Sequence, residues 1–165
     1  MNKQEIYNYL TEKNIKYEIT EHKAVYNMEE LAEGKLPHPE ADAKNLFVRD
    51  DKRQNYYLIT VKGEKRVNLK DFRRENGTRP LTFASPEELS EILVLIPGAV
   101  TPLGLLNDKD HRVKFYLDND FKDMEFIGVH PNDNTATVFL SFADLRSLIE
   151  EHGNGVLLLR FPEEG

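Results

Sequence analysis

The short spacing of the β-rich runs constrains the fold of this chain more than any other feature of the sequence. Each run has the length of one strand and is bounded by turn residues. The runs cover residues 16–21, 45–49, 56–61, 81–84, 113–117, 126–129, 136–140 and 156–159. They alternate irregularly with short helical patterns, without a regular β–α–β rhythm. We therefore predict an α+β fold with a mixed, partly closed, barrel-like β-sheet surrounded by short helices.

Helices are predicted where a capping residue precedes an apolar face and a glycine follows it. Asn2 lies three residues before Glu5, which is the spacing of a capping box. Ser85 and Glu88 repeat this pattern around Pro86, a residue favoured at the first helical position. The other predicted helices end at Gly34, run from Asn68 to Gly77, and run from Ser141 to Gly153.

The bulk properties of the chain limit its class. Its 165 residues fit one domain, spanning 1–165. Because no run of 18 or more apolar residues occurs, we predict no transmembrane helix. The first residues contain no apolar signal core, which predicts a cytoplasmic protein. The chain has no cysteine, so disulfides, zinc–thiolate sites and cysteine nucleophiles are excluded.

One basic segment stands out in a chain whose formal net charge is −7. Between Lys62 and Arg79 there are seven basic and three acidic residues, a net charge of +4. We expect the compensating acidic residues elsewhere, for example at Asp118 and Asp120. Such a segment is typical either of a solvated helix with ion pairs or of a face that binds nucleic acid. The charge pattern alone leaves both interpretations open.

The sequence motifs of the common catalytic sites are absent. There is no GxSxG elbow, P-loop, HExxH helix or GxGxxG turn. The five histidines are scattered, and no two of them have the spacing of metal ligands. We therefore predict no metal and no cofactor.

Two polar side chains are nevertheless candidates for a site. Lys44 directly precedes the strand-like residues 45–47, where its cation could meet a phosphate or a carbonyl group. His130 lies where a strand passes into a turn and could orient a polar group of a substrate. Each also has an ordinary structural interpretation, as a solvated lysine at a strand end and as a turn histidine bound to backbone.

The loop from Gly98 to Pro102 is the third candidate. Its Pro-Gly start favours a tight turn, and Pro102 pushes Thr101 toward extended geometry. The backbone amides of Ala99, Val100 and Thr101 could then point at one oxyanion. The alternative is a plain turn at the end of a helix.

These features occur together in a recognisable order. The motifs are HPEADAKNLF at 38–47, VKGEKRVNLK at 61–70, PGAVTPLGLLND at 97–108 and GVHPN at 128–132. In this order and spacing they resemble the YbaK family, whose relatives include the editing domain inserted in bacterial prolyl-tRNA synthetases. The most similar branch is that of the free-standing prolyl-tRNA editing proteins. The resemblance covers essentially the whole chain, and it implies the fold of that family.

The resemblance also implies an activity. Members of the family hydrolyse the ester between an amino acid and the terminal adenosine of a mischarged tRNA. Lys44 corresponds to the functionally important lysine of the family, and Gly98 and Pro102 match the ends of its substrate-binding loop. Asn45 and His130 fall where the family has polar pocket residues. A hydroxyl or phosphate of the substrate itself is thought to help activate water in this family.

From this resemblance we expect a hydrolase that removes alanine from tRNA(Pro) and needs no cofactor. Its partners would be the acceptor end of the tRNA and, as a second candidate, prolyl-tRNA synthetase, with no role for a membrane or DNA. We expect Leu46, Phe47 and Val100 to form the walls of a pocket too small for proline. The residues expected to follow tRNA phosphates are Lys62, Lys65, Arg66, Lys70, Arg73 and Arg74.

Three alternatives remain open at this point. The chain could remove cysteine or another small residue, as other branches of the family do. It could be a non-catalytic module that binds tRNA or a synthetase, although Lys44, Gly98 and His130 are all present. It could also hydrolyse free small esters, in which case activity would not depend on the basic segment or on salt.

Overall fold

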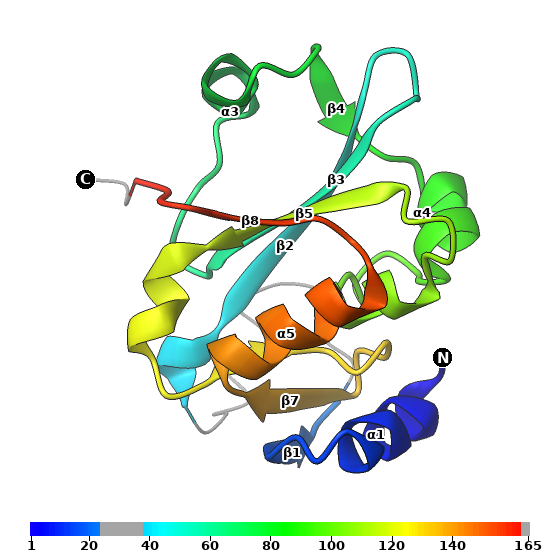
Figure 1. The fold of residues 1–165 in the computed structure, drawn as a ribbon, viewed down its shortest axis with the longest axis vertical. Helices are drawn as coiled ribbons and strands as arrows, with labels where there is room; N and C mark the ends of the chain where they lie inside the picture. Colours follow the sequence, from blue (N-terminus) through cyan, green and yellow to red (C-terminus); the bar gives the residue numbers. More distant parts are fainter. Residues whose placement is uncertain (24–37, 163–165) are drawn as a thin grey trace.

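Two sheets packed against each other form the framework of the molecule (Figure 1). The structure is a computed structural model that describes residues 1–23 and 38–162. The three-stranded sheet has the order β1-β7-β6, and all its pairs are antiparallel. Its strands are β1 (Tyr17–Glu21), β7 (Ala136–Leu140) and β6 (Ile127–Val129).

The five-stranded sheet is mixed and has the order β4-β2-β3-β5-β8. The antiparallel hairpin of β2 and β3 is extended by β4 on one side, and on the other side β5 and β8 run parallel to β3. Its strands are β2 (Ala43–Asp50), β3 (Tyr56–Lys62), β4 (Leu81–Phe83), β5 (Val113–Asp118) and β8 (Val156–Leu159). The α+β class and the mixed sheet are confirmed, and neither sheet closes on itself within residues 1–23 and 38–162.

The helices begin at the capping residues that the sequence marks. The side chain of Asn2 accepts a hydrogen bond from the Glu5 amide, Ser85 does the same for Glu88, and both capping boxes are complete. The α-helices are α1 (Lys3–Glu12), α3 (Leu69–Asn76), α4 (Pro86–Leu93) and α5 (Phe142–His152). The 3-10 helices are η1 (Pro39–Ala41), η2 (Pro102–Asn107) and η3 (Asn119–Asp123). The helix predicted to end at Gly34 lies outside the described residues.

The five-stranded sheet separates two apolar clusters. The larger cluster fills the space between the sheets and includes side chains from α1, α4, α5 and η2. The smaller cluster lies on the opposite face, where Phe72 of α3 packs edge-on against Tyr116 of β5. Alternation along β3 divides its side chains, so that Leu58 joins the larger cluster and Ile59 the smaller one. A residue's position in β2 or β3 therefore decides which face of the sheet it can serve.

A buried amide ties the starts of β5 and β8 together. Asn154 is almost fully buried, and its Nδ2 donates to the Asp108 carboxylate at 2.8 Å and to the Val113 carbonyl at 2.9 Å. Asp108 also accepts hydrogen bonds from the backbone amides of Arg112 and Val113. Two of these donors to the Asp108 carboxylate are backbone amides, and the third is the side chain of Asn154. Asn154 can therefore be substituted without altering the backbone.

We predict that Asn154→Ala lowers the free energy of unfolding by about 1–3 kcal/mol, because it removes the two buried hydrogen bonds to Asp108 and to the Val113 carbonyl. Urea unfolding followed by circular dichroism measures this change. Asn8→Ala, on the exposed face of α1, is the matched control and should change stability by less than about 0.5 kcal/mol. Equal effects of the two substitutions would contradict this role of Asn154.

Candidate active site

A buried hydroxyl joins the Gly98–Pro102 loop to the turn that begins at His130. Thr101 is fully buried, and its Oγ1 donates to the His130 carbonyl oxygen at 2.6 Å. Thr101 Oγ1 also accepts a hydrogen bond from the Leu103 amide at 3.3 Å. Thr101 therefore caps η2, with Pro102 at the first helical position. Two of the three predicted site features therefore lie next to each other.

The loop presents two backbone amides rather than the three predicted. Gly98 has φ +91°, a conformation that side chains rarely adopt, and this sets the turn. The Ala99 amide donates to the Ile96 carbonyl at 3.1 Å, so it is used within the turn. The amides of Val100 and Thr101 have no acceptor among the described residues.

The carbonyl of Ala136, the first residue of β7, fixes the proton on the ring of His130. The distance from His130 Nδ1 to this oxygen is 2.9 Å, and because a carbonyl only accepts, Nδ1 must donate. When the ring is neutral, Nε2 is therefore left as an acceptor. Burial is the main cause that lowers the pKa of His130 below its usual value, and His22 nearby lowers it further. His130 is thus held neutral at neutral pH.

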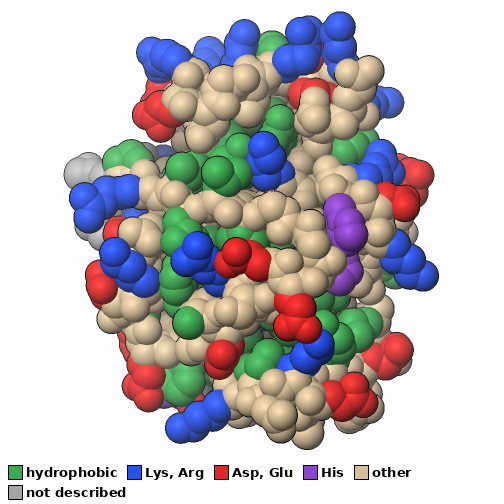
Figure 2. Space-filling view, in the orientation of Figure 1, with side chains coloured by type: hydrophobic (Ala, Val, Ile, Leu, Met, Phe, Trp, Pro, Cys, Tyr) green, Lys and Arg blue, Asp and Glu red, His purple; other side chains and the backbone are tan. Residues whose placement is uncertain are grey.

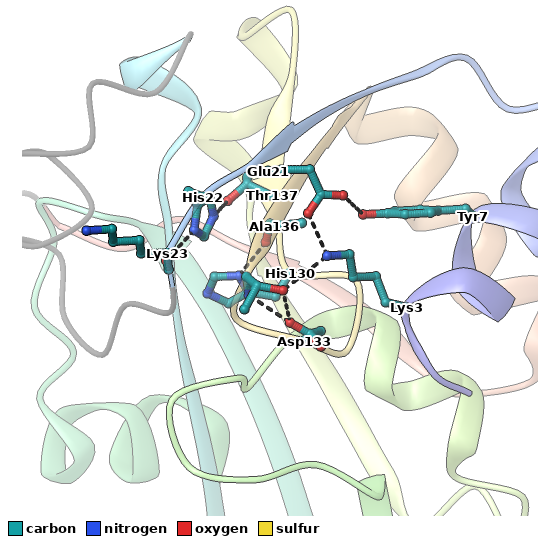
Figure 3. A network of polar contacts seen from close by, with 10 residues as sticks. Lys3, Tyr7, Glu21, His22, Lys23, His130, Asp133, Ala136 and Thr137 are labelled. Carbon is teal, nitrogen blue, oxygen red and sulfur yellow. Dashed lines mark hydrogen bonds and ion pairs between the residues drawn. The ribbon is translucent and has the colours of Figure 1, made fainter.

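A second histidine lies beside the first. His22 follows β1, and the centroids of its ring and the His130 ring are 6.2 Å apart (Figure 3). Its Nε2 lies 2.9 Å from Thr137 Oγ1 and its Nδ1 lies 2.7 Å from the Lys23 carbonyl. We did not predict a role for His22, because in the sequence it is one of five scattered histidines. Only the pairing of β1 with β7 brings it to this place.

Polar contacts from α1 and β1 hold the turn after His130 (Figure 3). Lys3 forms an ion pair with Glu21, and its ammonium also donates to Thr135 Oγ1 at 3.1 Å. The Thr135 amide donates to Asp133 at 2.8 Å, and hydrogen bonds from Thr135 are the main cause that lowers the pKa of this carboxyl. The turn is therefore fixed before any substrate arrives.

Lys44 lies apart from this junction. Its Nζ donates to the Lys65 carbonyl at 3.0 Å, and no hydrogen bond joins it to Thr101 or His130 within the described ranges. Lys44 is paired with Val61 in the β2–β3 hairpin, so it shares the face of the smaller cluster. Asn45, on the opposite face, accepts a hydrogen bond from Thr60 Oγ1 at 2.6 Å. The structure therefore brings Gly98–Pro102 and His130 together and holds Lys44 separately.

The prediction that Leu46 and Phe47 line one pocket is wrong for the pair. They are neighbours in β2 and so point to opposite faces of the sheet. Phe47 is buried between the sheets, where its ring stacks on Tyr56 with centroids 5.8 Å apart, and Val100 packs against the same cluster. Leu46 packs against the smaller cluster. Of the three predicted wall residues, only Phe47 and Val100 pack in the cluster between the sheets.

The prediction that Lys65 contacts tRNA phosphates is also wrong. Its side chain is fully buried, and its ammonium lies 2.8 Å from Asp118 and 2.7 Å from Asp120. These two carboxylates, which we expected elsewhere, are its direct partners. Lys62 is mostly buried as well, with 14% of its side chain exposed and Glu64 at 3.4 Å.

The remaining basic residues of the segment face solvent. Arg66 precedes α3, and Lys70, Arg73 and Arg74 lie on that helix. Arg74 forms an ion pair with Asp71 one turn earlier. Figure 2 shows Lys and Arg side chains gathered at the end of the molecule that carries α3 and the β2–β3 turn. This end is the exposed cationic surface of the described chain.

The described residues contain neither a metal-binding cluster nor a membrane-spanning helix. Nowhere in residues 1–23 and 38–162 do three His, Asp or Glu side chains gather so that they could hold a metal ion. No helix in the same ranges is both long and apolar enough to cross a bilayer.

The aminoacyl-tRNA editing domain family model matches residues 22–148, a range that contains Lys44, the Gly98–Pro102 loop, and both histidines of the junction. This chain belongs to the aminoacyl-tRNA editing domain family. The family assignment made from the sequence motifs is therefore confirmed. The buried hydroxyl, the two amides and the histidine pair all lie within this editing domain.

Two curated relatives match nearly the whole chain. The prolyl-tRNA editing protein ProX of Acetoanaerobium sticklandii is 37% identical over 152 residues, which is 92% of this chain and 93% of the relative. The prolyl-tRNA synthetase associated domain-containing protein 1 of Mus musculus is 36% identical over 155 residues, 89% of each chain. A crystal structure of a candidate trans-editing enzyme for prolyl-tRNA synthetase has the same fold, with a TM-score of 0.73 at 21% identity, and the match covers 100% of this chain and 99% of the other.

The lowered pKa of His130 predicts how stability depends on pH. Because the folded state disfavours the charged ring, the unfolded state binds more protons just below pH 6.5, the ordinary value. The contribution of His130 to the free energy of unfolding is then fully present above pH 6.5. It falls as the pH drops from there toward the folded pKa, by at most about 1.4 kcal/mol per pH unit. Urea unfolding of wild type and His130→Gln between pH 5 and 8 measures the difference. The same slope in both proteins would contradict the assignment.

Proposed function

We propose that this chain is a trans-editing hydrolase that removes alanine from mischarged tRNA(Pro). The observation that carries the proposal is the 37% identity with ProX, a prolyl-tRNA editing protein, along nearly the whole length of both chains. The family match and the similar fold of a candidate trans-editing enzyme add to it. We propose the cytoplasm as the place of action and prolyl-tRNA synthetase as a candidate partner.

The junction of loop and turn is suited to the cleavage of an ester. The amides of Val100 and Thr101 would donate to the carbonyl oxygen as it gains negative charge. His130 Nε2, an acceptor in the neutral ring, would orient the ammonium group of the amino acid. Water adds to the carbonyl carbon, the bond to the ribose oxygen breaks, and that oxygen takes the proton. A hydroxyl or phosphate of the substrate would assist the water, which explains why no dedicated nucleophile is needed.

Lys44, at the start of β2, would serve as a cation for a phosphate or a carbonyl oxygen of the substrate. An aminoacyl ester is reactive before it binds, so orientation and charge stabilisation are sufficient help. Asn45, next to it in β2, would contribute a polar contact on the opposite face. Gly98 and Pro102 would fix the two ends of the substrate-binding loop.

The choice of amino acid would follow from size. The aminoacylation site of a synthetase for proline discriminates against a smaller side chain by only about 1–3 kcal/mol, so alanine is attached at times. A second pocket that is too small for proline removes these errors without attacking the correct product. Val100 and Phe47 are the proposed walls, because both belong to the cluster between the sheets.

The decisive experiment measures release of amino acid from tRNA(Pro) charged separately with alanine, cysteine and proline. We predict fast release of alanine, no release of proline, and a loss of at least about 100-fold in the rate for Lys44→Ala. Thin-layer separation of labelled aminoacyl-adenosine gives the rates. Fast release of cysteine instead of alanine would keep the chemistry and change the substrate. If none of the three is released, the proposal is wrong and a binding module is favoured.

The exposed cationic surface would follow the phosphates of the acceptor stem, with Arg66, Lys70, Arg73 and Arg74 as its proposed contacts. We predict that Lys70→Glu with Arg73→Glu raises KM by about tenfold or more and leaves the maximal rate unchanged. The slope of log KM against the logarithm of the salt concentration should fall by about 0.7–0.9 for each lost phosphate contact. Steady-state kinetics at several salt concentrations measure both effects.

Lys16→Glu with Lys109→Glu is the matched control for this double charge reversal, because it changes the net charge equally at two exposed lysines that lie outside α3. It should leave KM unchanged. The same rise in KM for both variants would show that only net charge matters, and it would contradict a specific tRNA surface on α3.

A further inference from the structure

The fully buried ammonium of Lys65 takes no direct part in the chemistry described above. It lies 3.0 Å and 2.8 Å from the two carboxylate oxygens of Asp118, and 2.7 Å from Asp120. Burial alone would lower the pKa of Lys65, but the hydrogen bonds to these two carboxylates outweigh it and raise the pKa. The hydrogen bond from Lys65 is likewise the main cause that lowers the pKa of Asp120. The lysine is therefore a permanent cation in the interior.

This ion pair fixes the turn that follows β3. Asp118 also accepts a hydrogen bond from the Lys62 amide at 3.1 Å, and the Lys65 amide donates to the Lys62 carbonyl at 2.9 Å. The Gly63 amide donates to the Asp42 carbonyl at 2.9 Å, which ties the turn to the start of β2. Residues 62–65 are thus held by backbone hydrogen bonds and by the carboxylate of Asp118, which is more than 50 positions away in the sequence.

The turn in its fixed position holds Lys44. The carbonyl of Lys65, the residue whose own side chain is anchored, accepts the hydrogen bond from Lys44 Nζ at 3.0 Å. A lysine side chain is long and flexible, so a cation that must meet one substrate atom needs such a fixed acceptor. A shift of this carbonyl would move the ammonium of Lys44 while leaving its backbone in β2.

We propose that Lys65, held by Asp118 and Asp120, is a positioning residue that orients Lys44 for the deacylation reaction. The inference rests on the proposed function, in which Lys44 meets the substrate. It assigns the lysine of the GEKR sequence at 63–66 a role in the rate of the reaction. A phosphate contact would instead affect the binding of tRNA, and a purely structural ion pair would affect stability alone, since apolar residues can replace many buried pairs.

The test compares wild type with Lys65→Met, Asp120→Asn and Glu64→Gln on alanyl-tRNA(Pro), below the unfolding temperature of each variant. We expect Lys65→Met to lower the single-turnover rate by about 10- to 100-fold without raising the tRNA concentration that gives half-maximal rate. Glu64→Gln, on the exposed side of the same turn, should match wild type. Should Lys65→Met fail to fold, Asp120→Asn keeps the Asp118 pair and should still lower the rate severalfold.

The same substitutions are then made in the Lys44→Ala background. If Lys65 acts through Lys44, the two losses are not multiplicative, and Lys65→Met has little further effect there. Equal fold-losses in both backgrounds, or a raised half-maximal concentration with an unchanged rate, would overturn the inference. Wild type that releases neither alanine nor cysteine would instead refute the proposed function itself, so the two failures can be told apart.

Discussion

The hydrogen bond from Thr101 to the His130 carbonyl is the contact on which the candidate site depends. It joins the loop that follows α4 to a turn of the other sheet, and the Thr101 side chain is fully buried. In such surroundings an unpaired hydroxyl or carbonyl is costly, so the two segments are strongly coupled. The proposed contacts with the carbonyl and ammonium groups of the substrate lie at this junction, which joins the loop that carries the Val100 and Thr101 amides to a histidine whose tautomer is fixed.

The buried ion pair of Lys65 fixes the turn whose carbonyl holds Lys44. A charge in the interior costs free energy unless carboxylates surround it, and Asp118 and Asp120 provide them. Such a pair contributes little to stability compared with apolar packing, but it specifies one arrangement of the turn. The loop and the histidine thus have one rigid support, and Lys44 has another.

Local chemistry explains which parts of the fold could be predicted. The capping boxes at Asn2 and Ser85, the caps at Asn68 and Ser141, and the β2–β3 hairpin depend on residues within a few positions of each other, and all are confirmed. Contacts between distant segments could not be predicted in this way. The sequence places Lys65 among exposed cations, because its partner Asp118 belongs to another strand. It likewise separates His22 from His130 by more than 100 residues.

The most direct test of the account is an NMR titration with a stable analogue of alanyl-adenosine in which an amide replaces the ester. The account predicts that the largest shifts occur at the Val100 and Thr101 amides and at the His130 ring, with smaller changes at Lys44. Binding with shifts confined to α3 or to the exposed surface, while these amides and the His130 ring stay unchanged, would contradict the assignment of the site.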